Sequence, residues 1–215
     1  MPQSLKDILG STLEAGDRRC TLREAFFNID DGILRYVALD IGGWLNVDEV
    51  LVQANYLRAP EQEGGAWHIA LGDSELKHAP AWNDGNRRDI TDMTSWPPVI
   101  VGPFGNAFAP MLIHEQMRDM ETGAEEAEPG RGTADRLVTR LQKVGAWIGL
   151  PVFSDHGEEG EVLDILVDPD SLQIVALEVG ESSLLSSTGR KVPYGAVRHV
   201  AEQGTHLVVA PDTGG

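Results

Sequence analysis

Histidines are the residues of this chain best suited to metal or acid–base chemistry, so their spacing is considered first. The motif His114-Glu115-Gln116-Met117-Arg118 fails the HExxH zinc pattern, because Arg118 stands where the second histidine ligand is required. His199 and His206 flank the last predicted turn, but two imidazoles without a nearby cysteine make a poor closed zinc site. We therefore predict no metal site among the six histidines His68, His78, His114, His156, His199 and His206.

Two further motifs resemble catalytic or nucleotide-binding patterns without completing them. Gly180-Glu181-Ser182-Ser183-Leu184 has leucine where the GxSxG nucleophile turn requires its last glycine. Gly130-Arg131-Gly132-Thr133 lacks both the third glycine and the preceding strand of a dinucleotide-binding loop. These failures predict no catalytic residue and no cofactor, and the alternative left open is an enzyme whose active site lies between two domains.

The cysteine content and the N-terminus indicate a reducing compartment. Cys20 is the single cysteine, so an intrachain disulfide is excluded, and its strand-like surroundings suit a small buried thiol. Residues 1–7 lack the apolar core of a signal peptide, and no apolar run approaches the roughly 20 residues that span a bilayer. We expect a cytoplasmic protein without a transmembrane segment.

The charge of the chain argues against polyanionic partners. It has 34 acidic against 17 basic residues among 215, a formal net charge of −17. Divided into 1–80, 81–132 and 133–215, the charge is −6, −5 and −6, so no segment hides a basic module. Binding to phosphate backbones or anionic lipid depends on lysine and arginine. Direct binding of nucleic acid or of an anionic membrane is therefore disfavoured.

An internal repeat defines the organisation of the chain. Residues 29–42 match residues 167–180 at an offset of 138, with six of the 14 positions identical. The match continues upstream, where 8–10 pairs with 147–149, and downstream, where 52–58 pairs with 192–198 and 67–71 with 206–210. Such a long period excludes a solenoid and predicts two copies of one small domain.

Short strands separated by turns are predicted within each copy. Apolar clusters of four to nine residues alternate with turn sequences such as Asp168-Pro169-Asp170-Ser171, where Pro169 presets φ and the aspartates can accept backbone N–H bonds. Five or six strands in about 70 residues favour a small closed barrel, which leaves no open sheet edge. The predicted fold class is thus all-β dominated, with two barrels in tandem.

The connector between the copies has two parts. Residues 96–110 contain four prolines, which exclude a continuous helix and favour an extended chain. This part either covers a barrel or docks a partner, and in the second case the partner-binding residues would be Trp96, Phe104 and Phe108. Residues 111–120 could form a short helix, and 121–132 are acidic and rich in glycine and proline. A further helix is predicted from Thr133, with Leu137, Leu141 and Val144 on one face and Gly145 near its end.

The second copy resembles a known family. Its pattern comprises Ile148-Gly149, the run from Gly157 to Pro169, Val175-Ala176-Leu177-Glu178-Val179-Gly180 and Val192-Pro193-Tyr194-Gly195. This pattern, over about residues 146–210, resembles a PRC-barrel domain, which occurs in the cytoplasmic part of the photosynthetic reaction-centre H subunit and in a ribosome maturation factor. The first copy, about residues 5–71, departs from it at Gln53, where the proline of the Val-Pro-Tyr step is expected.

The resemblance implies antiparallel β-barrels that act as assembly modules, without a common catalytic residue. We predict a first barrel in 1–80, a connector in 81–132 with one or two short helices, and a helix followed by the second barrel in 133–215. The leading hypothesis is a non-enzymatic scaffold that binds another protein or itself, including as a homodimer. Two alternatives stay open: a ribosome-assembly factor that binds a basic ribosomal protein, and a peripheral partner of a photosynthetic or membrane redox complex.

Overall fold

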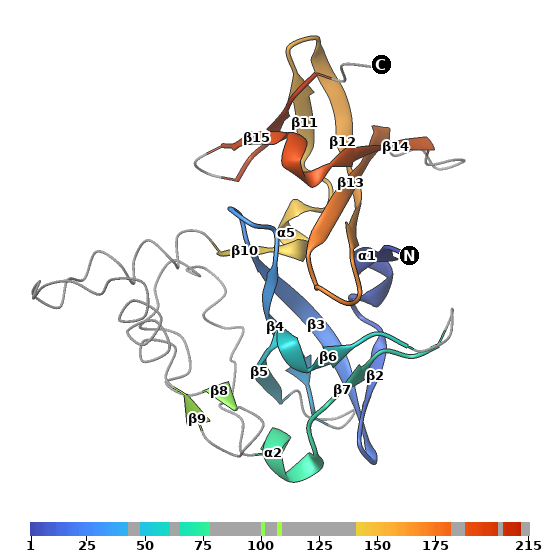
Figure 1. Ribbon diagram of the computed structural model, residues 1–215, viewed down its shortest axis with the longest axis vertical. Coiled ribbons are helices and arrows are strands. Elements are labelled where there is room, and N and C mark those ends of the chain that lie inside the picture. Colours follow the sequence, from blue (N-terminus) through green and yellow to red (C-terminus); the bar gives the residue numbers. More distant parts are fainter. Residues whose placement is uncertain are drawn as a thin grey trace, which may run out of the picture. The chain divides into compact units, whose positions relative to one another are not determined.

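The computed structural model describes residues 1–42, 48–60, 65–77, 100–101, 107–108, 141–181, 188–201 and 204–211 (Figure 1). The elements of the first copy are, in chain order, β1 (Gln3–Ser4), α1 (Leu5–Ile8), β2 (Thr12–Ala15), β3 (Arg18–Asn28), β4 (Leu34–Asp40), β5 (Glu49–Gln53), the 3-10 turn η1 (Ala54–Tyr56), β6 (Leu57–Arg58) and β7 (His68–Ile69). The helix α2 (Asp73–Lys77) and the strands β8 (Ile100–Val101) and β9 (Ala107–Phe108) follow.

The second copy repeats this series element by element. It comprises β10 (Leu141–Lys143), α5 (Val144–Trp147), β11 (Pro151–Ser154), β12 (Gly157–Val167), β13 (Ile174–Glu181), β14 (Thr188–Pro193), the 3-10 turn η4 (Tyr194–Ala196), β15 (Val197–Val200) and β16 (Leu207–Val209). Each element has a counterpart of the same type and order in the first copy. The order of helices and strands is therefore the same in the two repeats.

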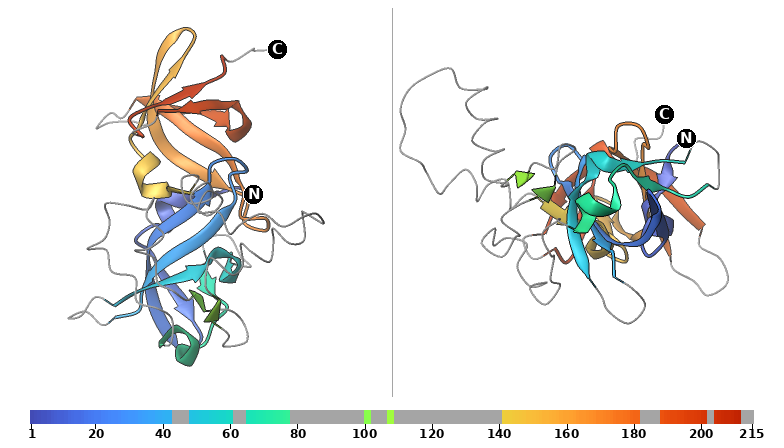
Figure 2. Two further views of the ribbon diagram at one scale, coloured as in Figure 1. Left: turned by 90° about the vertical axis from the view of Figure 1, so that its left-hand side faces the viewer. Right: turned by 90° about the horizontal axis from the view of Figure 1, so that it is seen from below.

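The strands form two sheets with the same internal order. One sheet runs β14-β13-β12-β11-β16-β15, and the other runs β6-β7-β2-β3-β4-β5-β8-β9 (Figures 1 and 2). Read from the 3-10 turn side, β15-β16-β11-β12-β13-β14 and β6-β7-β2-β3-β4-β5 are the same arrangement. The strand-rich fold class is confirmed.

The sheets differ from the prediction in two respects. Each contains a parallel pair, β11 with β16 and β2 with β7, so they are mixed rather than antiparallel. The cause is that β16 and β7 form a hairpin with the preceding strand and return beside β11 and β2, the strands that follow the short helices α5 and α1. The path of hydrogen-bonded strands is also open, because among the described residues neither sheet pairs its first strand with its last.

The short helices α1 and α5 end in the same way, although only α1 has a side-chain cap at its start. Ser4 caps α1, accepting a hydrogen bond from the N–H of Asp7 at 3.0 Å. Both helices stop after one turn at a glycine with positive φ, Gly10 at 78° and Gly149 at 83°. Glycine adopts the left-handed conformation with less steric cost than any other residue. The matched glycines Gly10 and Gly149 therefore end both helices.

Contacts divide the chain into two compact units that are not consecutive halves. One unit contains residues 1–11, 24–34 and 142–215, and the other contains 12–23 and 35–141. The first unit thus combines most of the second copy with two segments of the first copy. Its core includes Leu5, Phe26, Phe27, Trp147, Val152 and Ile165, and the core of the other unit includes Leu13, Leu22, Leu39, Leu51, Leu57 and Leu76, all at most 1% exposed.

The alignment of the two copies requires a correction. Identity alone aligned Leu34 with Leu172, an offset of 138, whereas the hydrogen bonds align Leu34 with Ile174, an offset of 140. The offset is 139 at the start of each copy and becomes 140 at a β-bulge in β12, where Glu159 is the inserted residue. A shift of two residues keeps every side chain on its face of a strand, so the apolar pattern could not reveal it.

The helix predicted from Thr133 is wrong in its C-terminal part. Leu141–Lys143 form strand β10, and helix α5 begins only at Val144. Pairing of β10 with β3 overrides the helical spacing of Leu137, Leu141 and Val144. The rest of that helix, the predicted helix at 111–120, Trp96, Phe104 and the side chain of Phe108 lie outside the described residues.

Candidate binding cleft

The cleft is built on a hairpin turn of the first copy, between β3 and β4. Asn28 closes this turn: its carbonyl accepts the N–H of Gly32 at 2.8 Å, and its side-chain oxygen accepts the N–H of Asp30, also at 2.8 Å. In the second copy Asp168 does the same, accepting N–H groups from Leu172 and Asp170. Asparagine and aspartate close such turns because their side chains reach the backbone two residues on. The predicted role of Asp168 as a turn acceptor is confirmed.

The two hairpin turns bind each other within the first unit, and each contact has its reciprocal. Leu34 N–H donates to the carbonyl of Leu172, and Ile174 N–H donates to the carbonyl of Gly32, both at 2.9 Å. Leu34 corresponds to Ile174 and Gly32 to Leu172. Each copy therefore donates the equivalent hydrogen bond to the other. Reciprocal bonds of this kind characterise isologous contacts between identical subunits.

The short helices make a second reciprocal contact. The N–H of Lys6 in α1 donates to Asp164 Oδ1 of β12 at 3.1 Å, and the N–H of Gly145 in α5 donates to Glu24 Oε1 of β3 at 3.0 Å. In both cases a carboxylate on the long strand of one copy satisfies an N–H in the first turn of the helix of the other. Unpaired N–H groups at a helix start are stabilised by such acceptors.

An aromatic cluster breaks the equivalence of the copies. Phe27 and Trp147 meet edge to face with ring centroids 4.9 Å apart, and Tyr194 lies 6.3 Å from each ring. The corresponding residues are Val167, Ile8 and Ala54, none of which is aromatic. The cluster therefore exists once, and it fixes the 3-10 turn η4 against the first copy's hairpin turn.

Tyr194 is held in place at both ends of its side chain. Its hydroxyl donates to the carbonyl of Ile29 at 2.7 Å, and burial raises the pKa of the phenol. Its ring lies over Gly32, where an added Cβ would come within 2.7 Å of the ring, and Gly32 has a φ of 68°. Only glycine suits both the left-handed backbone and the close approach of the ring.

Beside Tyr194 lies an open cleft of about 440 Å³. Its walls come from Ile29 and Asp30 of the first copy and from residues 194–195 and 197–200 of the second, which bring Arg198 and His199 to the cleft. All of these residues belong to the first compact unit. The cleft is thus a composite of the two copies, with apolar walls, one carboxylate and two basic side chains.

A smaller depression of about 340 Å³ in the same unit is acidic. It is lined by Glu158, Glu161 and Glu181, together with Pro151, Gly160 and Gly180. The backbones approach closely there, since a Cβ on Gly160 would lie 2.5 Å from the carbonyl oxygen of Gly180. The first copy has Cys20 and Asp40 in place of these two glycines.

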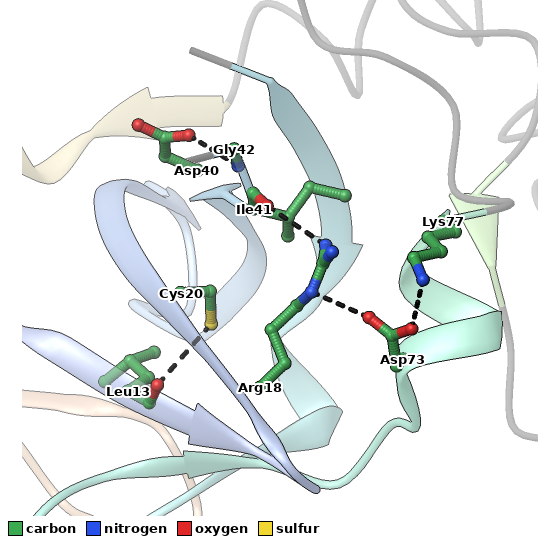
Figure 3. Close-up of polar contacts among 8 residues, drawn as sticks. All are labelled: Leu13, Arg18, Cys20, Asp40, Ile41, Gly42, Asp73 and Lys77. Carbon is green, nitrogen blue, oxygen red and sulfur yellow. Dashed lines mark hydrogen bonds and ion pairs between the residues drawn. The ribbon is translucent and has the colours of Figure 1, made fainter. Parts of the chain in front are cut away.

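In the second unit, the equivalent region is a structural polar cluster (Figure 3). Arg18 joins three segments, pairing with Asp73 at 2.7 Å and donating to the carbonyl of Ile41 at 3.0 Å (Figure 3). Asp40 accepts the N–H groups of Gly42 and Asp48 on one oxygen and the guanidinium of Arg23 at 2.6 Å on the other. Burial alone would raise the pKa of Asp40, but these bonds outweigh it and lower the pKa.

Cys20 lies in the same cluster and is chemically shielded. The side chain is 3% exposed, and its Sγ lies 3.8 Å from the carbonyl oxygen of Leu13 (Figure 3). Burial raises the pKa of the thiol to about 11, with a smaller opposing effect from Arg18. The predicted buried thiol is confirmed, and it is unsuited to nucleophilic chemistry at neutral pH.

The histidines are dispersed. His68 lies in β7, His156 in the β11–β12 turn and His199 in β15. The ring of His206 packs edge to face on Phe153, with the ring centroids 5.6 Å apart. Within the described ranges no three metal-ligating side chains come together. His78 and His114 lie outside those ranges.

Comparison with models of known protein families and with curated proteins returned no match for this chain. The cleft therefore has to be interpreted from its own residues. Sequence reasoning did not identify it, although one signal was present: Arg198 recurs in the first copy as Arg58, whereas Tyr194 and His199 are replaced by alanines, Ala54 and Ala59.

Proposed function

We propose that the protein is a non-enzymatic adaptor in which two PRC-barrel-like domains, fused in one chain, bind another protein. The observation that carries this proposal is the composite cleft, whose walls come from both copies. A cleft of this kind exists only when the two copies are joined, so duplication created a surface that one domain lacks. Folding in this way also adds buried area to domains that would be marginal alone.

The assignment of each copy to the PRC-barrel type is part of the same proposal. It is supported by the six strands that recur in the same order in both copies, with one parallel pair in each. It is supported further by the sequence of the second copy. The open strand path is compatible with a barrel that closes through side chains rather than through a complete hydrogen-bond ladder.

A binding role fits the chemistry of the cleft better than catalysis does. Arg198, His199 and Asp30 are exposed side chains, and no hydrogen bond joins any two of them within the described part of the chain. A nucleophile activated by a general base needs the two side chains within hydrogen-bond reach of each other. Recognition requires only that the groups face a common ligand.

The partner class is limited by charge. A net charge of −17 repels nucleic acid and anionic lipid at long range. No helix in the described ranges is long and apolar enough to cross a membrane. The proposal includes a protein partner and, from the sequence alone, a cytoplasmic location.

The alternative of a ribosome-assembly factor is favoured by one observation, the acidic depression at Glu158, Glu161 and Glu181. A basic ribosomal protein would be attracted there and by the chain as a whole. Association with a photosynthetic or membrane redox complex follows from the resemblance alone. Self-association as a homodimer has to overcome the repulsion between two chains of −17.

The test is affinity capture with the full-length chain at low and moderate salt, with the captured proteins identified by mass spectrometry. An adaptor should retain a stoichiometric protein partner. The triple variant Trp96→Ala, Phe104→Ala and Phe108→Ala tests the connector as a second contact. Failure to enrich any protein over a charge-matched acidic control at low salt would contradict the adaptor proposal, and so would turnover of a small molecule in the cleft.

A further inference from the structure

The basic side chains of the cleft are placed there by a β-bulge. β15 pairs with β16 through Val197 and Val209, then through His199 and Val208, so Arg198 has no opposite residue. Neighbouring residues of a regular strand point to opposite faces, but a bulge redirects a side chain and lets both Arg198 and His199 line the same cleft. Bulges are frequent at functional sites for this reason.

Both basic side chains are without internal partners. Within the described ranges, neither Arg198 nor His199 makes a hydrogen bond or an ion pair, and both are exposed. This distinguishes Arg198 from its counterpart Arg58, whose guanidinium donates to the backbone carbonyls of Asn55 and Leu57. The first copy uses the arginine to fasten its own 3-10 turn, and the second copy leaves the same position available to a ligand.

The rest of the cleft combines aliphatic side chains with the ring of Tyr194. Ile29, Val197 and Val200 contribute aliphatic side chains, and the ring of Tyr194 is fixed by its hydroxyl bond to Ile29. Asp30 adds one carboxylate. A ligand therefore meets two basic groups, a single acid and aliphatic walls.

We propose that this cleft binds an acidic side chain of a protein partner, presented in an extended segment with aliphatic neighbours. This inference rests on the proposed adaptor function and specifies its partner chemistry. The Arg198 guanidinium forms a paired, charge-assisted hydrogen bond with the carboxylate, His199 provides a second donor, and the aliphatic walls take the neighbouring side chains.

The charge of the chain selects a single carboxylate over a polyanion. Arg198 is the one lysine or arginine among the residues that line the cleft, whereas Asp30 and a net charge of −17 oppose the accumulation of negative charge there. A nucleic-acid strand or a phosphorylated segment brings at least two negative charges to the same place. The cleft therefore suits an isolated glutamate or aspartate in an otherwise neutral or basic partner.

The test uses two blocked peptides, acetyl-SVEVS-amide and acetyl-SVQVS-amide, titrated into the full-length isotopically labelled chain and followed by NMR. We expect the glutamate peptide to shift the signals of Tyr194, Arg198 and His199 and to bind at least tenfold more tightly than the glutamine peptide. Arg198→Ala should lower the affinity at least tenfold, and Arg198→Lys should lower it less. Arg19→Ala, an exposed arginine of β3 that does not line the cleft, is the matched control and should leave the affinity unchanged.

Equal binding of the two peptides, or an unchanged affinity of Arg198→Ala, would overturn the inference. Tighter binding of inorganic phosphate than of the glutamate peptide would also overturn it, in favour of a phosphate ligand. Affinity capture separates this failure from that of the adaptor proposal. If Arg198→Ala captures the same partner as the native chain, the adaptor function stands and the proposed acidic side chain in the cleft is wrong. If neither chain captures a partner, the adaptor function itself fails.

Discussion

Ile33 forms an antiparallel bridge with Gln173, the residue at the same place in the other copy. A residue that pairs with its own counterpart lies at the centre of a reciprocal contact, as in an isologous dimer interface. The bonds on either side agree, since Leu34 donates to Leu172 and Ile174 donates to Gly32. Two segments of the first copy thereby become part of the compact unit that holds the second copy and the cleft.

The packing of Tyr194 on Gly32 predicts that Gly32→Ala destabilises the protein strongly. The left-handed backbone of the new alanine should cost about 1 to 2 kcal/mol of stability. The clash of its methyl group with the ring of Tyr194 should cost about 1 to 3 kcal/mol more. Urea unfolding at equilibrium measures the loss. Gly16→Ala is the control, because Gly16 also has a positive φ, 59°, but open space around it. It should cost only the left-handed alanine, about 1 to 2 kcal/mol.

A double-mutant cycle isolates the ring contact. In a Tyr194→Ala background the space above Gly32 is empty, so Gly32→Ala should cost no more than Gly16→Ala does. An equal cost of Gly32→Ala in both backgrounds would show that the ring does not constrain this position.

Removal of the side-chain hydroxyl should affect stability differently at Tyr194 and at Tyr56. The hydroxyl of Tyr194 donates to Ile29, so Tyr194→Phe should lower stability by about 1 kcal/mol. The hydroxyl of Tyr56 is buried and has no hydrogen-bond partner within the described ranges, so Tyr56→Phe should leave stability unchanged or raise it by up to about 1 kcal/mol. Urea midpoints of both variants measure the difference, and a loss at Tyr56 as large as that at Tyr194 would contradict it.

The duplication, the strand content and the turns were predictable because they depend on local residue types. Asp168 was recognised as a turn residue from its neighbours, and Cys20 as buried from its apolar surroundings. The register was not predictable, because a strand shifted by two residues keeps its pattern, and the inserted residue, Glu159, is identified only by its bulge. That bulge is fastened by a bond of Glu159 to Arg190 at 2.9 Å, which the sequence does not reveal.

The cleft was not predictable for a different reason. Its walls are residues 29–30 on one side and 194–195 and 197–200 on the other. These segments are separated by more than 160 positions and meet through the reciprocal contact of the hairpin turns. Local propensity also misassigned Leu141, which has helical spacing but pairs as a strand with β3. Pairing between distant segments decides both features, and no single segment encodes it.

The lowered pKa of Asp40 predicts how the stability of the protein changes with pH. Its folded-state pKa is lowered, so its contribution is present above the unfolded value near 4 and is lost as the pH falls through the folded value. Asp40→Asn should therefore destabilise the chain at pH 7, by about 1 to 2 kcal/mol, and the difference from the native chain should shrink toward pH 3. Urea midpoints at both pH values measure this, with the exposed turn variant Asp17→Asn as control. A difference that is constant with pH would contradict the role of the Asp40 charge.

Burial of Cys20 predicts that the folded chain resists alkylation. With the pKa of the thiol at about 11, the thiolate fraction at pH 8 is at least about a hundredfold lower than for an ordinary cysteine, and burial limits access further. Iodoacetamide labelling, followed by mass spectrometry across a urea series, should track the unfolded fraction. The variant Thr12→Cys in a Cys20→Ala background places a thiol at an exposed position of β2 and should label rapidly without urea. Rapid labelling of Cys20 in the native chain would mean that the β2–β3 hairpin opens far more often than global unfolding allows.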